Sequence, residues 1–341
     1  MNYSRLKQSL SKAIVPTFSK LPYRYWPRAI KGNFIPIFML HRFESKECGI
    51  RGHAIEVVEN CFEFLRKNKF DIVSIEEAVR IKEQGLQLER PTVSFSIDDG
   101  YWDQFEIGAD IFQKYDCPTT YFITTAMIGG DDWLWDAKIG YLLEEAVNNN
   151  TLSAVLSYFN VPCSDLEQIQ ESIVVKLKFS SNEQIDNKIL QVSKILDIEI
   201  PQKVPSSYSY MSWDNIINLN KQGMKVGPHS QYHNVLTKLQ AGYMKEEIEG
   251  SWEDLKTKIE SPTPVFCYPI GKSSDFGERE MRAVKESGMN AAVTAMPGAM
   301  HLKDGMEVYS IPRYSFPQTL LDFKQYSSWI EEYKAHFRSR F

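Results

Sequence analysis

Short apolar runs alternate with longer amphipathic stretches along most of the chain. Runs of this length are typical of buried strands, and the stretches between them have the spacing of helices with one apolar face. The predicted strands are residues 34–40, 71–74, 92–97, 119–124, 224–227, 264–268, 291–294 and 308–311. The clearest predicted helices are residues 53–67, 74–84, 103–115, 213–222, 241–260 and 277–287. This alternation indicates an α/β fold with a parallel sheet.

One long segment departs from the alternation. Residues 131–210 show helical periodicity, around 139–147 and 166–196, but no clear strand. We therefore predict a helical insertion between the fourth and fifth strands. Residues 1–33 are expected to form a basic arm, and residues 317–341 a helix on the outside of the fold.

Length and composition fit one large globular domain. The chain has 341 residues, of which 43% are hydrophobic and 13% aromatic, and single α/β barrels of this length are ordinary. No apolar run is long enough to span a membrane, and the N-terminus lacks the continuous apolar segment of a secretory signal. The five cysteines include no Cys-x-x-Cys pair, so we expect reduced thiols and a cytoplasmic location.

Positive charge is concentrated at the N-terminus. Residues 1–43 contain eight lysines and arginines and no acidic residue, so the rest of the chain carries −13 within a total of −5. This arm could contact an anionic membrane surface; the alternative, which we favour, is a solvated tail packed beneath the fold. The acidic remainder argues against nucleic acid as a partner. The sequence leaves the oligomeric state open.

Two adjacent carboxylates, Asp98 and Asp99, close one predicted strand, and a histidine pair, His229 and His233, lies far downstream. Adjacent strand residues point to opposite sides, so both acids serve one pocket only if the strand end turns, which Gly100 permits. Histidines four apart lie on one face of a helical turn, within reach of one ion. With one carboxylate they would form an open, catalytic metal site, and the other carboxylate, Asp98, would act as a base. Each motif alone is also common in ordinary turns and helix caps.

The position of these residues supports a shared site. Polar candidates follow the predicted strands at their carboxyl ends: His41 after the first strand, the two aspartates after the third, His229 after the fifth, Pro269 after the sixth and Arg313 after the last. In α/β barrels, active sites form at this rim.

Five motifs carry a family resemblance. They are Met-Leu-His-Arg (39–42), Val-Ser-Phe-Ser-Ile-Asp-Asp-Gly-Tyr (93–101), Gly-Pro-His-Ser-Gln-Tyr-His (227–233), Phe-Cys-Tyr-Pro-Ile-Gly (266–271) and Ile-Pro-Arg (311–313). In this order they resemble the polysaccharide deacetylases of the chitooligosaccharide deacetylase (NodB) homology group, carbohydrate esterase family 4, over about residues 34–316. The resemblance implies a distorted (β/α)7 barrel similar to a TIM barrel. It also implies a divalent metal, zinc or alternatively cobalt or nickel, used to remove N-acetyl groups from amino sugars.

The resemblance assigns roles to individual residues. Asp99, His229 and His233 would hold the metal, and Asp98 would take a proton from the attacking water. The backbone N–H of Ile270 would stabilise the oxyanion.

Two departures from the usual motifs shift the remaining roles. The late Leu-x-His of many members is missing, so His41 is the candidate proton donor, as in circularly permuted members; otherwise it is a core histidine. Cys267 stands where an arginine is usual, so Arg313 is expected to pair with Asp98 instead and keep it ionised.

Several aromatic residues adjoin the motifs and could stack on sugar rings, although packing is an equal alternative. They are Tyr101, Trp102, Trp133, Trp135, Tyr232 and Tyr268. Asp136 could reach a sugar hydroxyl. His53 and His301 lie outside the motifs and are expected at the surface.

Three functions remain open. The first is a metal-dependent deacetylase acting on N-acetylated sugars of a polysaccharide, oligosaccharide or glycolipid. The second is a C–N hydrolase of the same fold that acts on a small amide or imide. The third is an inactive carbohydrate-binding relative.

Overall fold

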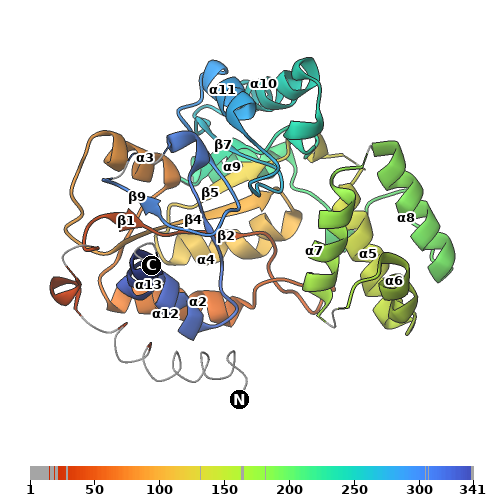
Figure 1. Cartoon of the computed structure of the whole chain (residues 1–341), viewed down its shortest axis with the longest axis horizontal. Coiled ribbons are helices and arrows are strands. Elements are labelled where there is room, and N and C mark those ends of the chain that lie inside the picture. Colours follow the sequence, from red (N-terminus) through yellow and green to blue (C-terminus); the bar gives the residue numbers. More distant parts are fainter. Residues whose placement is uncertain are drawn as a thin grey trace.

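A mostly parallel sheet lies at the centre of the molecule, with helices around it (Figure 1). The computed structural model of the chain describes residues 15, 19, 22–27, 30–130, 132–162, 165–180, 182–303, 305 and 307–338. The strands are β1 (Phe34–Ile35), β2 (Ile37–Leu40), β3 (Asp71–Ile72), β4 (Thr92–Asp99), β5 (Thr120–Ile123), β6 (Lys225–Pro228), β7 (Val265–Cys267), β8 (Ala291–Val293), β9 (Met300–His301) and β10 (Tyr314–Ser315). The α-helices are α2 (Ile55–Lys67), α3 (Ile75–Glu83), α4 (Ala109–Lys114), α5 (Trp135–Asn148), α6 (Leu152–Phe159), α7 (Leu166–Leu177), α8 (Asn182–Leu196), α9 (Trp213–Lys221), α10 (Ala241–Lys258), α11 (Glu278–Glu286), α12 (Leu320–Ser327) and α13 (Trp329–Arg338).

The strand register brings the carboxyl ends together. The main sheet has the order β10-β2-β4-β5-β6, and its pairs are parallel. Leu40 at the end of β2 pairs with Ile97 of β4, and Asp99 at the end of β4 pairs with Ile123 of β5. Ile123 in turn pairs with Pro228 at the end of β6. The residues that follow these strand ends therefore share one edge of the sheet.

Strands β7 and β8 extend the curved sheet toward a barrel but do not close it. Strands β7 and β8 form a separate parallel pair, and an isolated parallel bridge joins Val293 of β8 to Ile311. A backbone hydrogen bond from Thr263 to Val226 links the segment before β7 to β6. The fold is therefore α/β, as predicted, but the strand pairings among the described residues do not close the barrel.

Aromatic packing holds the helices against the sheet. Phe38 of β2 and Phe95 of β4 lie in one buried cluster with phenylalanines of α2, α4 and α12. All eight residues of β4 are buried, as expected for a central parallel strand covered on both faces.

The helical insertion predicted between the fourth and fifth strands is present as α5 to α8, between β5 and β6. These helices lie together at one side of the molecule (Figure 1) and share their own apolar cluster, which includes Ile139, Leu143, Ile173 and Ile189. None of the helices in the described ranges is long and apolar enough to cross a membrane.

Three predicted elements were wrong in detail. The predicted strand at 308–311 is a 3-10 turn, Val308–Ser310, and the last strand is β10 instead; Pro312 lacks the N–H that a continuing ladder needs. The predicted helix at 103–115 begins as a π-helix, Gln104–Gly108. The single predicted C-terminal helix is two helices, because Ser328 between them is extended. Residues 339–341 and most of the predicted arm at 1–33 lie outside the described residues.

Candidate metal centre and catalytic site

A turn at the end of β4 lets two neighbouring aspartates face different partners in one pocket. Asp99 has a φ of 85° and Gly100 a φ of 92°, so the left-handed turn starts one residue before the predicted glycine. Left-handed backbone is uncommon for residues other than glycine, although aspartate tolerates it better than most. Asp98 and Asp99 are both buried there.

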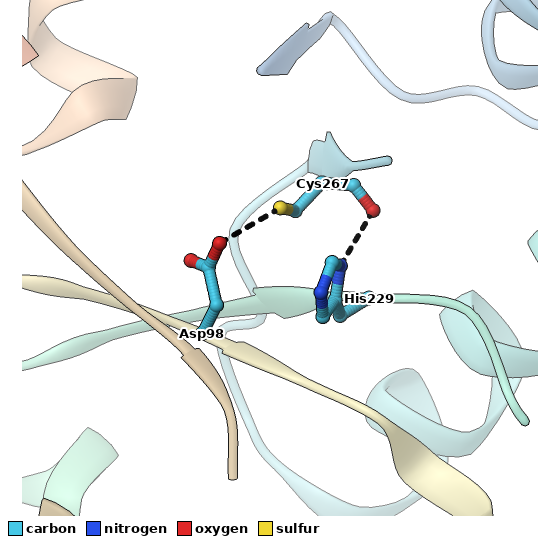
Figure 2. A group of neighbouring side chains, drawn as sticks. All are labelled: Asp98, His229 and Cys267. Carbon is cyan, nitrogen blue, oxygen red and sulfur yellow. Dashed lines mark hydrogen bonds between the residues drawn. The ribbon is translucent and has the colours of Figure 1, made fainter. Parts of the chain in front are cut away.

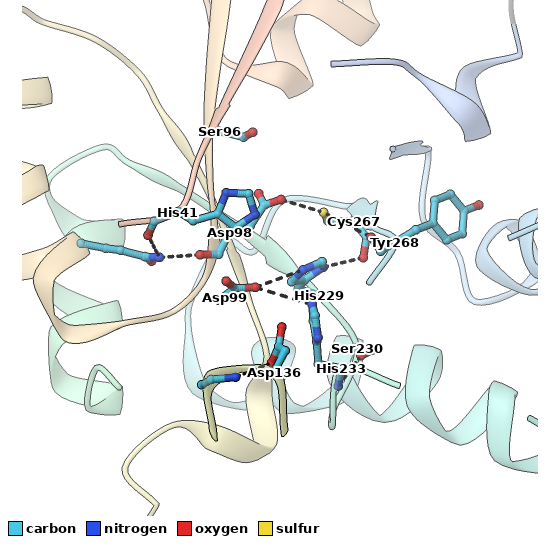
Figure 3. A network of polar contacts seen from close by, with 12 residues as sticks. His41, Ser96, Asp98, Asp99, Asp136, His229, Ser230, His233, Cys267 and Tyr268 are labelled. Carbon is cyan, nitrogen blue, oxygen red and sulfur yellow. Dashed lines mark hydrogen bonds and ion pairs between the residues drawn. The ribbon is translucent and has the colours of Figure 1, made fainter. Parts of the chain in front are cut away.

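Asp99 and the two motif histidines converge on one point. The Oδ1 atom of Asp99 lies 3.4 Å from His229 Nε2 and 3.6 Å from His233 Nε2 (Figure 3). One ligand atom from each residue lies within 4.8 Å of the others. One carboxylate and two imidazoles suit zinc and leave coordination positions open. The residues present therefore fit a catalytic divalent metal.

A backbone contact fixes the orientation of His229. Its Nδ1 atom lies 2.8 Å from the carbonyl oxygen of Cys267, which can only accept a hydrogen bond (Figure 2). Nδ1 therefore carries a proton, and Nε2 is the nitrogen on the side of Asp99. Metal-binding histidines are commonly held in this way.

The spacing of the two histidines predicted a helical turn, but the structure has none there. Residues 229–235 form a loop after β6, in which Ser230 and His233 have φ values of 60° and 58°. The hydroxyl of Ser230 accepts a hydrogen bond from the N–H of His233 at 3.0 Å. This local hydrogen bond replaces a helical one and still brings both imidazoles to Asp99.

Asp98 is held by a bidentate ion pair. The guanidinium of Arg313 donates to both carboxylate oxygens of Asp98, each at 2.8 Å, so the predicted partner does reach it. The hydroxyl of Ser96 and the carbonyl of Thr294 accept further hydrogen bonds from Arg313, at 2.8 and 2.9 Å. Burial raises the pKa of Asp98, but the charge and hydrogen bonds of Arg313, together with the charges of His229 and His41, outweigh this effect and hold the pKa below its usual value. Asp98 is therefore an ionised carboxylate at neutral pH.

Cys267 lies against this ion pair. Its Sγ atom is 3.1 Å from Arg313 Nη2 and 3.4 Å from Asp98 Oδ2. Burial raises the pKa of its thiol, so Cys267 is a poor nucleophile. Asp98, His229 and Cys267 could together reach one ion. The guanidinium next to them opposes a cation, however, so the Asp99 group is the better metal site.

His41 lies beside the two aspartates, as Figure 3 shows. Its charge acts on the pKa values of Asp98, Asp99 and His233. Gln104, in the π-helix, donates from Nε2 to the carbonyl oxygen of His41 at 2.6 Å and also to that of Asp98. The strand-end segments that carry His41 and Asp98 are thus joined by one buried side chain.

The loop after β7 carries Ile270. This residue has a φ of 59°, and the next, Gly271, has a φ of 64°. A Cβ atom on Gly271 would lie 2.7 Å from the backbone nitrogen of Ala295, so only glycine fits there. Within the described part of the chain, the N–H of Ile270 donates no hydrogen bond. It is available for an oxyanion.

The predicted sugar-contacting residues differ in their surroundings. Tyr101 is buried, stacked on Tyr210 at 4.9 Å and covered by Arg42 at 4.1 Å. Tyr268 is 1% exposed and stacked on Phe276 at 4.6 Å. Neither ring offers a free face on which a sugar could stack.

Trp102 and Trp135 are half-buried, whereas Tyr232 is 56% exposed. Trp133 is buried and packs against other aromatic rings of the insertion. Asp136, in the first turn of α5, points toward Asp99 and His233 (Figure 3). Burial raises its pKa above the usual value.

The two remaining histidines do not both lie at the surface. His53 is half-buried next to Phe316, and burial together with the neighbouring His41 lowers its pKa to about 4. The prediction of a surface position for His53 was wrong, since its segment pairs with Phe43 just after the motif histidine. His301 is 39% exposed and lies 3.3 Å from Glu332.

Sequence analysis missed two residues that support the site. Ser96 lies two positions before Asp98 and therefore on the same face of β4. This spacing could have predicted that Ser96 lies near the partners of Asp98. Gln104 had no such signal, because its role depends on the π-helix.

Comparisons with known proteins concern the family and the fold. A family model described as polysaccharide deacetylase matches residues 86–292. No curated protein matches the chain at a significant level. Among solved structures, a Streptococcus pyogenes deacetylase, PplD, in complex with acetate is 14% identical with a TM-score of 0.57, covering 86% of this chain and 98% of that one. IcaB from Ammonifex degensii is 14% identical, with a TM-score of 0.55 and coverage of 87% and 97%. The deacetylase domain of BpsB from Bordetella bronchiseptica is 13% identical, with a TM-score of 0.52 and coverage of 85% and 99%. At these identities the likeness concerns the fold alone.

Proposed function

The chain belongs to the polysaccharide deacetylase family, and we propose that it hydrolyses N-acetyl groups of amino sugars in a polysaccharide, oligosaccharide or glycolipid. The observation that carries the proposal is the convergence of Asp99, His229 and His233 beside an ionised Asp98. A cytoplasmic location stays a prediction, and a membrane contact of the basic arm stays the less favoured alternative to a solvated tail.

The reaction breaks the C–N bond of the acetamide and forms a C–O bond to water, giving acetate and a free amine. A divalent cation on Asp99, His229 and His233 would supply Lewis-acid activation of the carbonyl and of water. Asp98 would accept the proton of the attacking water, and Arg313 keeps it ionised for this step. The N–H of Ile270 would donate to the oxyanion as it develops.

The leaving amine needs a proton, and we assign its delivery to His41. His41 lies beside Asp98 and Asp99. It is the remaining motif histidine, since the other two face Asp99. Asp136 and the half-buried Trp102 and Trp135 would contact the sugar, with Tyr232 at the outer edge.

Acetate release tests the proposed function. We expect the purified protein to release acetate from N-acetylglucosamine oligomers, together with an equal amount of free amine. The activity should be lost after chelation of the metal and should recover when zinc is added. Acetate and amine are measured together, and small amides and imides without a sugar serve as comparison substrates. Hydrolysis of the small compounds alone would favour the second function, and zinc binding without any hydrolysis would favour the inactive relative.

A His41→Gln substitution tests the proton donor. We expect kcat on the N-acetylated sugar to fall about 10²-fold with unchanged zinc content, because general acid catalysis contributes at least this much. An activated acetate ester, whose leaving group needs no proton, should lose much less activity. His301→Gln is the control, since this histidine lies at the surface. Equal losses on amide and ester would remove His41 from this role.

A further inference from the structure

A buried ion pair joins the helical insertion to the loop after β7. Lys178, directly after α7, places its Nζ atom 2.6 Å from Oδ1 of Asp275 and 3.0 Å from the hydroxyl of Ser274. The Lys178 side chain is 4% exposed and that of Asp275 is not exposed. In Figure 1, α7 lies on the side of the insertion that faces the sheet.

Asp275 also organises the loop itself. Its Oδ2 accepts a hydrogen bond from the N–H of Lys272 at 3.0 Å, and its Oδ1 accepts one from Ser274 at 3.0 Å. The N–H of Asp275 donates back to the carbonyl of Lys272 at 2.9 Å. Both carboxylate oxygens are therefore used, and the loop closes around a buried charge that is paired directly with Lys178, while the charge of Lys238 acts on it from further away. A buried charge without a partner is costly, so this loop conformation depends on the insertion.

The same loop holds the candidate oxyanion donor. Ile270 and Gly271 both have left-handed φ values, which cost free energy unless the surroundings fix them. The carbonyl of Gly271 accepts a hydrogen bond from the N–H of Ala295 at 2.9 Å. Two contacts thus hold the loop after Ile270: one at Gly271, the next residue, and one at Asp275, four residues after Gly271.

A second ion pair links the same two segments at the surface. Lys272 Nζ lies 3.3 Å from Glu171 of α7, but the two side chains are 44% and 62% exposed. Exposed pairs contribute little to stability. The chain therefore offers a matched control, because the two pairs bridge the same segments and differ in burial.

We propose that Lys178 and Asp275 are positioning residues for hydrolysis: through them, α7 of the insertion fixes the loop at 269–275 and so the N–H of Ile270. The proposal rests on the proposed function. In this proposal the helical insertion supports the active site, because α7 helps to position the N–H of Ile270, which would act in the transition state.

Kinetics and hydrogen exchange of Lys178→Met test the proposal. We expect kcat to fall about 10-fold or more with KM and zinc content near wild type, because an oxyanion donor acts on the transition state rather than on bound substrate. Amide hydrogen exchange of the 269–277 segment should become faster. Lys178→Arg should recover part of kcat, and Glu171→Gln should change neither measurement.

Ser274→Ala is a milder variant for the case in which Lys178→Met does not fold, and it should shift kcat and exchange in the same direction. Unchanged kcat in a folded Lys178→Met protein, or a fall in kcat with unchanged exchange at 269–277, would overturn the proposal. If the wild type releases no acetate, the proposed function fails instead, and the exchange data still decide whether the ion pair holds the loop.

Discussion

Replacing Asp98 by asparagine is expected to lower kcat/KM for an N-acetylated sugar by about 10²–10⁴-fold, the range that a general base contributes. Asparagine keeps the shape of the side chain but cannot accept a proton. The zinc content should stay near wild type, because the metal group is formed by Asp99 and the two histidines. Acetate release and metal analysis on the same preparation check both statements.

Asp99→Asn is the matched variant at the neighbouring position. It should lose most of the bound zinc as well as the activity, since Asp99 is the carboxylate that faces both imidazoles. If Asp98→Asn keeps its activity, Asp98 is not the base. If Asp98→Asn loses zinc instead, the metal belongs to the group formed by Asp98, His229 and Cys267.

Much of this site could be predicted because parallel strands present their carboxyl ends at one edge. The apolar runs located β2, β4 and β6, and the register then places the residues after them side by side. The pairing of Asp98 with Arg313 was expected from the family resemblance, because Cys267 replaces the usual arginine, and it is present although the two residues are 215 positions apart in the sequence. Here Arg313 precedes β10, after the bridge at Ile311, so the strand assignment was wrong while the contact was right.

Side-chain direction and loop backbone were harder to predict. Cys267 faces the site, and its neighbour Tyr268 therefore points the other way, into the packing against Phe276, which a period-two argument could have indicated. The loop that brings the two histidines together depends on left-handed residues at Ser230 and His233. Neither is a glycine, and the spacing alone favoured a helix.

Removing Arg313 is expected to lower the free energy of unfolding by about 3–5 kcal/mol at neutral pH, because Asp98 would stay buried without its charge partner. Arg313 now holds the pKa of Asp98 below its usual value of about 4, so the stability that this pair contributes is lost only as pH falls through that lower pKa. In Arg313→Met, the opposing effect of Arg313 is gone, and burial, the largest effect, raises the pKa of Asp98. The difference in stability from wild type should therefore be largest near neutral pH and shrink toward pH of about 4, as Asp98 takes up a proton. Denaturant unfolding at several pH values measures it.

The raised pKa of Asp98 in Arg313→Met should also change the pH dependence of catalysis. Because Asp98 must be ionised to act as a base, the acidic limb of the kcat/KM profile moves to higher pH. Cys267→Arg in this background would return an arginine to the position next to Asp98 Oδ2, which Cys267 Sγ now contacts at 3.4 Å. We expect this double variant to recover part of the stability and to move the acidic limb back toward wild type. An Arg313→Met protein with wild-type stability and an unshifted acidic limb would show that the ion pair does not control Asp98.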